Sequence, residues 1–233
     1  MPVIKYLFDL SDQSISFDIN LNETTLLLEN GDQETLPEWT RLGVSQCRNC
    51  PLSEAESKVC PVAVNLAPLV RLVSTLDSYR DVAVSVMTEQ RTISAQTTVQ
   101  RGVSSLLGLI MATSACPHTA LLRPMARFHL PFSTEMETIY RAASSYLLAQ
   151  YILAKRGGKP DLELSGLKSV YESLQVVNRA LAQRLRSASE RDAPVNAIIL
   201  LDLFAKEVPH SIDDILEGIN YMYKPYLESL IPM

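Results

Sequence analysis

The sequence predicts an α+β fold, with a small antiparallel sheet from the N-terminal third plus a strand near residues 82–99, packed on a mostly helical C-terminal half. Three observations predict it. Apolar residues alternate with polar ones in the first 28 residues, a Val- and Thr-rich alternating segment covers residues 81–100, and helical periods dominate after residue 102. We expect one domain over residues 1–233, with the sheet and a cysteine loop in 1–100 and the helical part in 101–233, because the late strand returns to pair with the first ones.

The N-terminal third begins with the runs VIKYLFDL, SISFDINL and TTLLLE, which are separated by short polar breaks and predict strands and a hairpin. Residues 36–62 hold several prolines and three of the four cysteines without a sustained period, which indicates an irregular loop. Residues 65–76 carry apolar side chains on one helical face. We expect a short helix there, with Pro68 in its first turn, where proline is tolerated.

The alternating segment 81–100 predicts one long strand or a hairpin. Residues 103–115 are apolar nearly all round, which is typical of a buried central helix. A further helix begins after Thr134, because Glu137 three residues later completes a capping box, and the sequence KRGGKP ends it.

The strongest helical period covers residues 164–185, where apolar residues recur every three or four positions. This stripe suits either the core or the interface of a homodimer, and we expect it to face the core. Two more helices are predicted, at residues 195–208 and 212–230.

Composition and charge exclude several classes of protein. Hydrophobic residues make up 47% and charged residues 20% of the 233, which excludes a disordered chain or a coiled coil. The formal charge of −5 argues against general nucleic-acid binding, which needs a surplus of Lys and Arg. The first residues do not resemble a signal peptide, and no apolar run approaches the length that spans a membrane. We therefore expect a cytoplasmic protein with no membrane association.

The four cysteines predict a metal site. Cys47 and Cys50 form a CxxC pair, Cys60 follows after nine intervening residues, and Cys116 follows after a further 55. Two thiolates at this spacing can bind one ion from a tight turn, in zinc and iron–sulfur sites alike. Cys50, Cys60 and Cys116 each precede a proline, which holds the preceding residue extended. We expect the four cysteines to hold a zinc ion or a [4Fe-4S] cluster, and the spacing does not choose between them.

Two alternatives for the cysteines stay open. Free buried cysteines behave as small hydrophobic residues. The pair of Cys47 and Cys50 also suits a catalytic or regulatory dithiol, although no thioredoxin-like βαβ pattern surrounds it.

A second candidate region is a segment without acids. Between Glu89 and Glu135 there is no Asp, Glu or Lys, while arginines and histidines recur. Because the guanidinium fork matches carboxylate and phosphate, this segment is the predicted anion-binding surface. The candidate residues are Arg91, Arg123, Arg127, His118 and His129. Arg127 and His129 lie on the same side if residues 123–131 form a stiff extended stretch. Alternatively, the arginines pair with acids of the C-terminal helices and the histidines are structural.

Four stretches of the chain, PEWTRLGVSQCRNCPL, CPVAVNL, SSLLGLIMATSACPH and RPMARFHLPFS, together resemble an uncharacterised bacterial family of about this length. The resemblance spans nearly the whole chain and implies a single bacterial cytosolic domain, without implying a substrate. The fragment CRNCPL is also similar to the first cluster ligands of the iron–sulfur class of uracil-DNA glycosylases. The chain lacks their GEAPG-type loop and their later cysteine spacing, so that activity is not transferred.

Two classes of function follow. One is a binding or sensing module, in which the metal fixes the loop to the helical core and the arginine segment receives an anionic small molecule or protein. The other is a metal- or cluster-dependent enzyme, in which arginines orient an anionic substrate and a histidine moves protons. The motifs of dinucleotide-binding folds, P-loops and zinc proteases are absent from the sequence.

Overall fold

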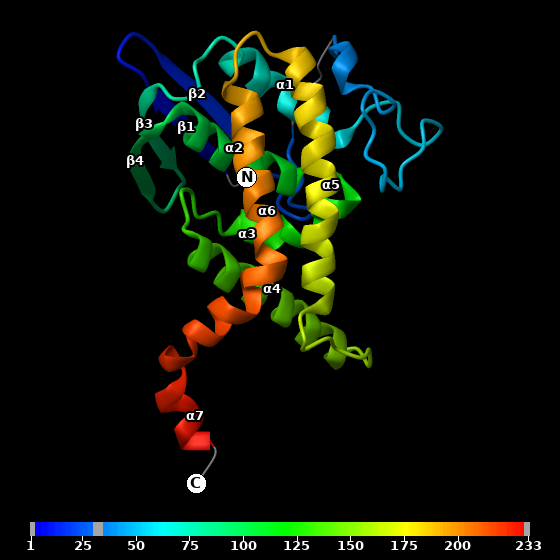
Figure 1. The fold of residues 1–233 in the computed structure, drawn as a ribbon, viewed down its shortest axis with the longest axis vertical. Coiled ribbons are helices and arrows are strands. Elements are labelled where there is room, and N and C mark those ends of the chain that lie inside the picture. Colours follow the sequence, from blue (N-terminus) through cyan, green and yellow to red (C-terminus); the bar gives the residue numbers. More distant parts are fainter. Residues whose placement is uncertain (1–2, 30–34, 231–233) are drawn as a thin grey trace.

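The computed structural model describes residues 3–29 and 35–230, and it has the predicted α+β architecture. Its sheet is antiparallel with the strand order β2-β1-β3-β4 (Figure 1). The strands are β1 Val3–Asp9, β2 Ser14–Asn20, β3 Asp81–Met87 and β4 Thr92–Thr98. The pairing of β1 with β3 confirms that the late segment returns to the N-terminal strands. That segment is a hairpin of two strands rather than one long strand.

Helices make up most of the remainder. They are α1 Pro61–Val73, α2 Val99–Thr113, α3 Arg123–Arg127, α4 Glu135–Lys155, α5 Ser165–Ala188, α6 Ala193–Gly218 and α7 Lys224–Leu230, with the 3-10 turns η1 Glu38–Thr40, η2 Pro117–Leu122 and η3 Asn220–Met222. No single helix in the described ranges is long and apolar enough to cross a membrane; α2 and residues 117–127 meet that test only as a pair bent by 109°.

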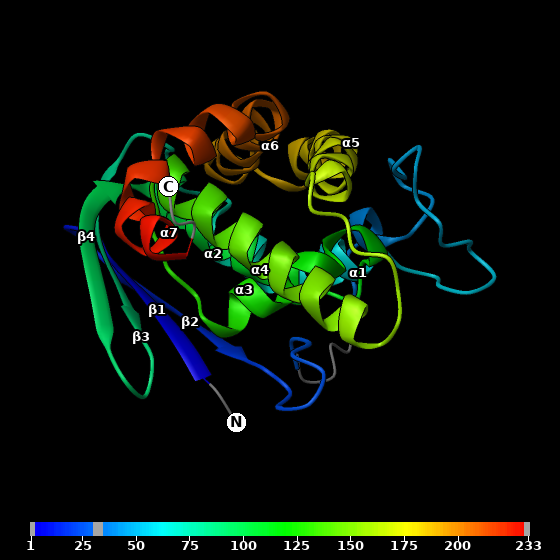
Figure 2. The same cartoon turned by 90° about the horizontal axis from the view of Figure 1, so that it is seen from below.

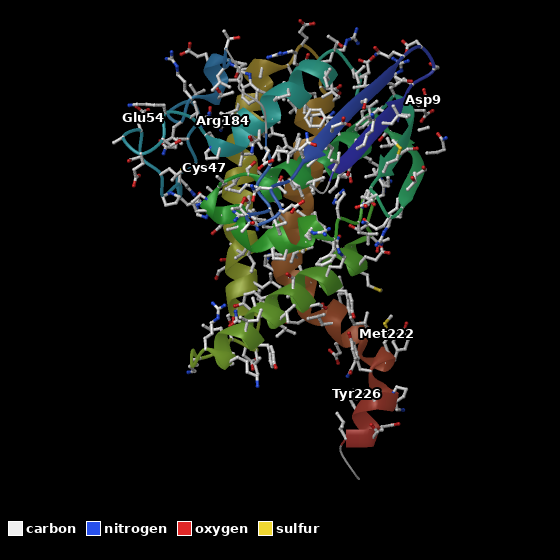
Figure 3. The ribbon with its side chains drawn as sticks, turned by 180° about the vertical axis from the view of Figure 1, so that it is seen from behind. Asp9, Cys47, Glu54, Arg184, Met222 and Tyr226 are labelled. Atoms are coloured by element: carbon white, nitrogen blue, oxygen red, sulfur yellow. The ribbon has the colours of Figure 1, made fainter. Side chains whose placement is uncertain are left out.

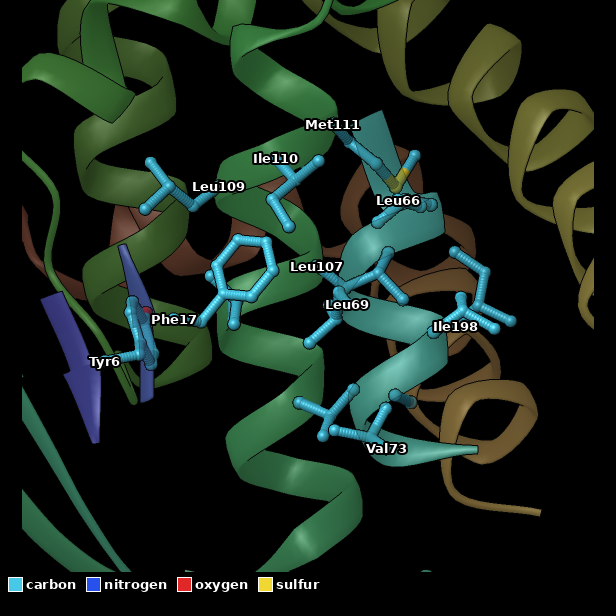
Figure 4. Packing of buried hydrophobic residues seen from close by; sticks show 14 of the residues in the cluster. Tyr6, Phe17, Leu66, Leu69, Val73, Leu107, Leu109, Ile110, Met111 and Ile198 are labelled. Atoms are coloured by element: carbon cyan, nitrogen blue, oxygen red, sulfur yellow. The ribbon is translucent and has the colours of Figure 1, made fainter. Parts of the chain in front are cut away.

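The sheet buries one face against α2. Side chains at alternate positions of β1 and β3 are buried, as a half-buried strand requires. Tyr6 and Phe17 lie on one side of α2, and Leu66 and Leu69 of α1 lie on the other (Figure 4). At Gly102 the helix approaches the sheet so closely that an added Cβ would lie 2.8 Å from Phe8. Helix α2 is therefore the central helix of the core, as its apolar sequence predicts.

The other side of α2 is covered by the long pair α5 and α6 (Figure 2). The stripe of α5 faces the core, as expected: Val177, Leu181 and Leu185 are buried in this cluster. A second hydrophobic cluster joins α4 to the N-terminal half of α5 and the C-terminal half of α6. The capping box at the start of α4 forms as predicted, and the helix ends at Lys155, within the sequence KRGGKP. The chain then turns at Gly157, whose φ of +83° suits glycine.

Three sequence predictions need correction. The run TTLLLE forms no strand and contributes only the isolated bridge of Leu21 with Leu28. Helix α1 begins at Pro61, so Pro68 lies inside it rather than in its first turn. Helix α6 continues through Pro209 to Gly218, where two helices were expected. Val208 and Ile212 are both buried, and their packing outweighs the hydrogen bond that proline cannot donate.

Candidate metal centre

Residues 36–60, the cysteine loop, leave the body of the molecule and return to it at a narrow neck (Figure 1). At the neck, Cys60 N–H donates to the Thr40 carbonyl at 2.8 Å and Leu42 N–H donates to the Lys58 carbonyl at 3.1 Å. Between these bonds, Arg41 and Val59 form an antiparallel bridge. The loop is irregular, as predicted, but its two ends are paired.

The neck is fastened to the helical core by Arg184 of α5, whose exposed fraction is only 2%. Its guanidinium donates to the carbonyls of Trp39 at 2.7 Å, Arg41 at 2.6 Å and Leu42 at 2.8 Å. Three carbonyl oxygens thus take the place of a carboxylate partner for this buried charge. Sequence reasoning missed Arg184. The signal was present, because Arg184 follows Leu181 by three positions and so lies on the apolar stripe of its helix.

Two of the cysteines begin helical segments. Cys60 precedes Pro61 at the start of α1, and Cys116 precedes Pro117 at the start of η2. Both have extended backbone, with φ, ψ of −77°, 120° and −73°, 126°, as expected before proline. In the CxxC pair, Cys50 N–H donates to the Cys47 carbonyl at 2.9 Å and closes a turn. All four thiols are free and half-buried.

The thiols of all four cysteines are close enough to affect one another's charge. The pKa of Cys47 is raised to about 12, mainly by burial and to a smaller extent by the charges of Cys60, Cys50 and Cys116. Burial also raises the pKa of Cys116, while the backbone N–H groups of His118 and Thr119 favour its thiolate. Four thiols gathered away from water resist ionisation unless a positive charge compensates them. The nearby positive charge of Arg184 favours the thiolate of Cys47 and so opposes the rise in its pKa.

Nevertheless, in the ranges 3–29 and 35–230 no three His, Cys, Asp or Glu side chains are arranged as a group that could hold a metal ion. The cysteines therefore share a neighbourhood without forming a ligand cage. The donor set itself fits zinc or an iron–sulfur cluster, both of which take four cysteine ligands. Figure 3 shows Cys47 and Arg184 in the same part of the molecule, and Cys47 packs against the main hydrophobic core.

His118 connects the CxxC turn to the segment that follows Cys116. Its Nε2 lies 2.7 Å from the carbonyl oxygen of Asn49, the residue before Cys50. Asn49 in turn donates from Nδ2 to the carbonyl of Ser173 in α5, at 3.4 Å. These bonds place His118 within the cysteine region, as its position in the sequence suggests, and give it a structural partner there.

The arginine segment does not form the stiff extended stretch that its prolines suggest. Residues 117–122 form η2 and residues 123–127 form α3. Arg123 begins α3 and its Nε is buried without a hydrogen-bond partner in the part of the chain that is described. Arg127 ends α3, is exposed, and stacks on Phe128 with its Cζ 5.9 Å from the ring centre. Arg91 is exposed in the turn between β3 and β4.

The ion pairs of the described residues use other arginines, so none of Arg91, Arg123 and Arg127 is bound to an acid of the C-terminal helices. The alternative that these arginines pair with those acids is wrong for the residues described.

His129 lies apart from Arg127, in a buried network with β1 and α2. The hydroxyl of Tyr6 lies 2.5 Å from His129 Nε2 and 2.9 Å from Ser105 Oγ. Burial, with a smaller contribution from the charge of Arg141, lowers the pKa of His129 to about 4, so the ring is neutral at pH 7 and can accept a hydrogen bond from the Tyr6 hydroxyl. Arg127 and His129 therefore do not form a common anion-binding surface.

A hollow of about 550 Å³ lies beside the neck of the cysteine loop. Its walls carry charges of both signs, from Glu38, Arg41, Glu54 and Lys58. None of the candidate metal or anion residues lines it.

Comparison with known proteins gives a family and no activity. No curated protein and no solved structure matches the chain. One family model matches residues 3–224, which is nearly the whole chain and includes both the cysteine loop and the helical half. The chain belongs to the family described as Domain of unknown function (DUF6901).

Proposed function

We propose that this protein is a metal-binding module in which Cys47, Cys50, Cys60 and Cys116 hold a zinc ion or an iron–sulfur cluster. The observation that carries the proposal is the mutual electrostatic influence of four thiols that come from the cysteine loop, the start of α1 and the start of η2. Unmetallated thiols gain little from such a gathering, whereas a bound cation would stabilise all four as thiolates.

The local features of these cysteines support the same proposal. Backbone N–H groups directed at the Cys116 sulfur and the neighbouring guanidinium of Arg184 both favour a negatively charged site. The CxxC turn and the two Cys-Pro junctions fix where the sulfurs leave the backbone. A metal held by these residues would join the loop to α1 and η2, so its main effect would be to fold and fasten the loop.

The test is metal content in a set of single variants of the full chain, purified without oxygen. Each of three variants should lose most of the bound metal and also melt at a lower temperature: Cys47→Ser, Cys60→Ser and Cys116→Ser. Arg48→Ser is the matched control, because Arg48 is exposed within the same CxxC turn and carries no thiol. It should keep both metal and stability.

Two outcomes would overturn the proposal. If the wild-type protein contains no stoichiometric metal after anaerobic purification, the four thiols do not form the proposed metal site. Cys116→Ser with undiminished metal would show that the site does not join the loop to the later helices. A brown colour with absorption near about 400 nm would indicate a cluster, whereas a colourless protein with one zinc would indicate a structural zinc site.

A further inference from the structure

The C-terminal arm, residues 220–230, projects from the body of the molecule (Figure 1). It contains η3 and α7, and no residue of either is buried. Tyr223, Tyr226, Leu227 and Leu230 recur at helical spacing and form one apolar face. Figure 3 shows Met222 and Tyr226 on this arm, well away from the main core. A seven-residue helix is not stable alone in water, so this arm requires a surface to cover it.

A second uncovered apolar surface lies on α4. One side of this helix packs in the second hydrophobic cluster through Ile139 and Tyr146. The solvent-facing side next to it, the outer face of α4, also carries exposed Glu137 and Ser144, but most of its residues are apolar and fall together at 3.6 residues per turn: Met136, Tyr140, Leu147, Leu148, Tyr151 and Ile152. Leu148 and Tyr151 are each 59% exposed. A surface helix normally has a polar outer side, so an apolar one indicates an interaction site.

The arm of a chain reaches only the beginning of its own α4. The hydroxyl of Tyr140 is close enough to Tyr223 to raise the pKa of Tyr223, so the start of the arm lies near the start of α4. In Figure 1 the end of α4 lies on the other side of the molecule from α7. The half of the outer face from Leu147 to Ile152 is therefore left uncovered by its own arm.

We propose that the chain forms a twofold dimer in which the arm of each copy packs on the outer face of α4 of the other copy. Antiparallel alignment of the two α4 helices would bring the uncovered half of one outer face beside the arm of the other copy. The contact is self-complementary, as a twofold interface requires, because each chain supplies one arm and one outer face.

Charge favours the same arrangement. Exposed Lys155, Arg156 and Lys159 follow the outer face at the end of α4. Exposed Asp214 and Glu217 precede the arm at the end of α6. Antiparallel pairing brings the basic end of one copy toward the acidic end of the other, which favours this partner and this orientation.

The exposed area is sufficient for a stable dimer. At about 150–250 Å² for a whole aromatic side chain, the tyrosines of the arm and outer face leave roughly 400–700 Å² uncovered in each chain. The leucines, isoleucine and methionines add a comparable area. Two copies together therefore offer roughly 1,600–2,800 Å², which is enough for the roughly 1,200–2,000 Å² that specific interfaces bury.

The first test is sedimentation of the full chain from about 1 to about 100 μM. The average mass should rise toward twice that of the 25.9 kDa chain. The double variant Tyr226→Asp with Leu230→Asp places two negative charges on the apolar face of the arm. The double variant Leu148→Glu with Tyr151→Glu does the same to the outer face of α4. Each pair should raise the dissociation constant at least about 30-fold. Tyr79→Asp is the control, since Tyr79 is 75% exposed and lies outside both surfaces, and it should not change the dissociation constant.

Mixing the two monomeric variants gives a sharper test. A dimer of one arm variant with one outer-face variant retains one contact between an intact arm and an intact outer face. A dimer of two identical variants retains no such contact. The mixture should therefore form dimers that neither variant forms by itself. This result also shows that both variants are folded. Lys155→Glu with Arg156→Glu should weaken the dimer, and adding Asp214→Lys with Glu217→Lys to the same chain should restore it.

Three results would overturn the proposal: a wild-type chain that stays monomeric at all these concentrations, a dimer that neither variant pair weakens, or variants that do not associate when mixed. A monomeric wild-type chain that floats with anionic lipid vesicles would assign the same surfaces to a membrane instead.

Discussion

The sheet region and the cysteine loop are organised by different forces. In the sheet, alternate side chains of β1 and β3 are buried against α2, and each fully buried large apolar side chain contributes about 1.5–3 kcal/mol. In the loop, only Thr40 and Leu42 of residues 36–60 are buried. The loop depends instead on a few polar ties, chiefly to Arg184 and His118. Loss of one contact should therefore leave the structure of the sheet region intact, whereas loss of one polar tie should destabilise the whole cysteine loop.

The largest expected effect follows from removing the main tie. Arg184→Met keeps the length of the side chain and deletes three hydrogen bonds to buried carbonyls, which should lower the free energy of unfolding by about 3–5 kcal/mol. Denaturant unfolding measures the loss, and limited proteolysis should show cleavage in residues 36–60 first. Arg186→Met, an exposed position on the same helix, is the control. Equal stability of the two variants would contradict the fastening role.

A smaller effect is expected from acid in the sheet region. The folded pKa of His129 is about 4 and its ordinary value is about 6.5, so only the unfolded chain takes up this proton between those values. The contribution of His129 is fully present above pH about 6.5 and is lost as the pH falls toward 4, by about 1–3 kcal/mol. His129→Gln keeps an acceptor for Tyr6 and should flatten this part of the pH profile. An unchanged profile would refute the assignment.

The close contact of α2 with the sheet predicts a further difference between two glycines. Gly102→Ala places a Cβ against Phe8 and Val84 and should cost about 1–2 kcal/mol. Gly108→Ala meets only Leu201, at an ordinary 3.6 Å, and should be neutral or stabilising by up to about 1 kcal/mol because alanine favours helix. Melting temperatures of the two variants check the prediction. Neither substitution should disturb the proposed metal site, since both positions lie outside the cysteine region.

The smallest effect is expected on the surface of α3. Arg127→Ala removes an exposed side chain that stacks on the Phe128 ring and whose charge acts on exposed Glu23, so stability should change by less than about 0.5 kcal/mol. If Arg127 receives anions, inorganic phosphate should bind more weakly to the variant in a calorimetric titration. A loss well above 1 kcal/mol would indicate a structural role for Arg127 instead.

The sequence predicted the parts of the fold that have a strong period. The stripe of residues 164–185, the apolar segment 103–115 and the capping box at Thr134 each specify a local structure that packing then preserves. It failed where packing overrides a local break, as at Pro209, and where proline begins a helix instead of stiffening an extended chain, as at Pro117 and Pro124.

The residues proposed for the candidate site come from local sequence patterns, whereas the contacts that support these residues do not. The Cys-Pro junctions and the CxxC pair are local patterns, so the sequence shows them. Arg184 and its carbonyl partners lie more than 140 positions apart, and the pairing of His129 with Tyr6 spans 123 positions. No local pattern specifies such contacts. The outer face of α4 was partly visible as an apolar stripe, but only the packing shows which side is buried.

X-ray absorption at the metal edge of the anaerobically purified wild-type chain tests the central claim most directly. The account predicts stoichiometric metal with a shell of sulfur atoms, at about 2.3 Å for zinc. A shell dominated by nitrogen and oxygen, or protein that retains no metal while all four thiols remain free, would contradict it.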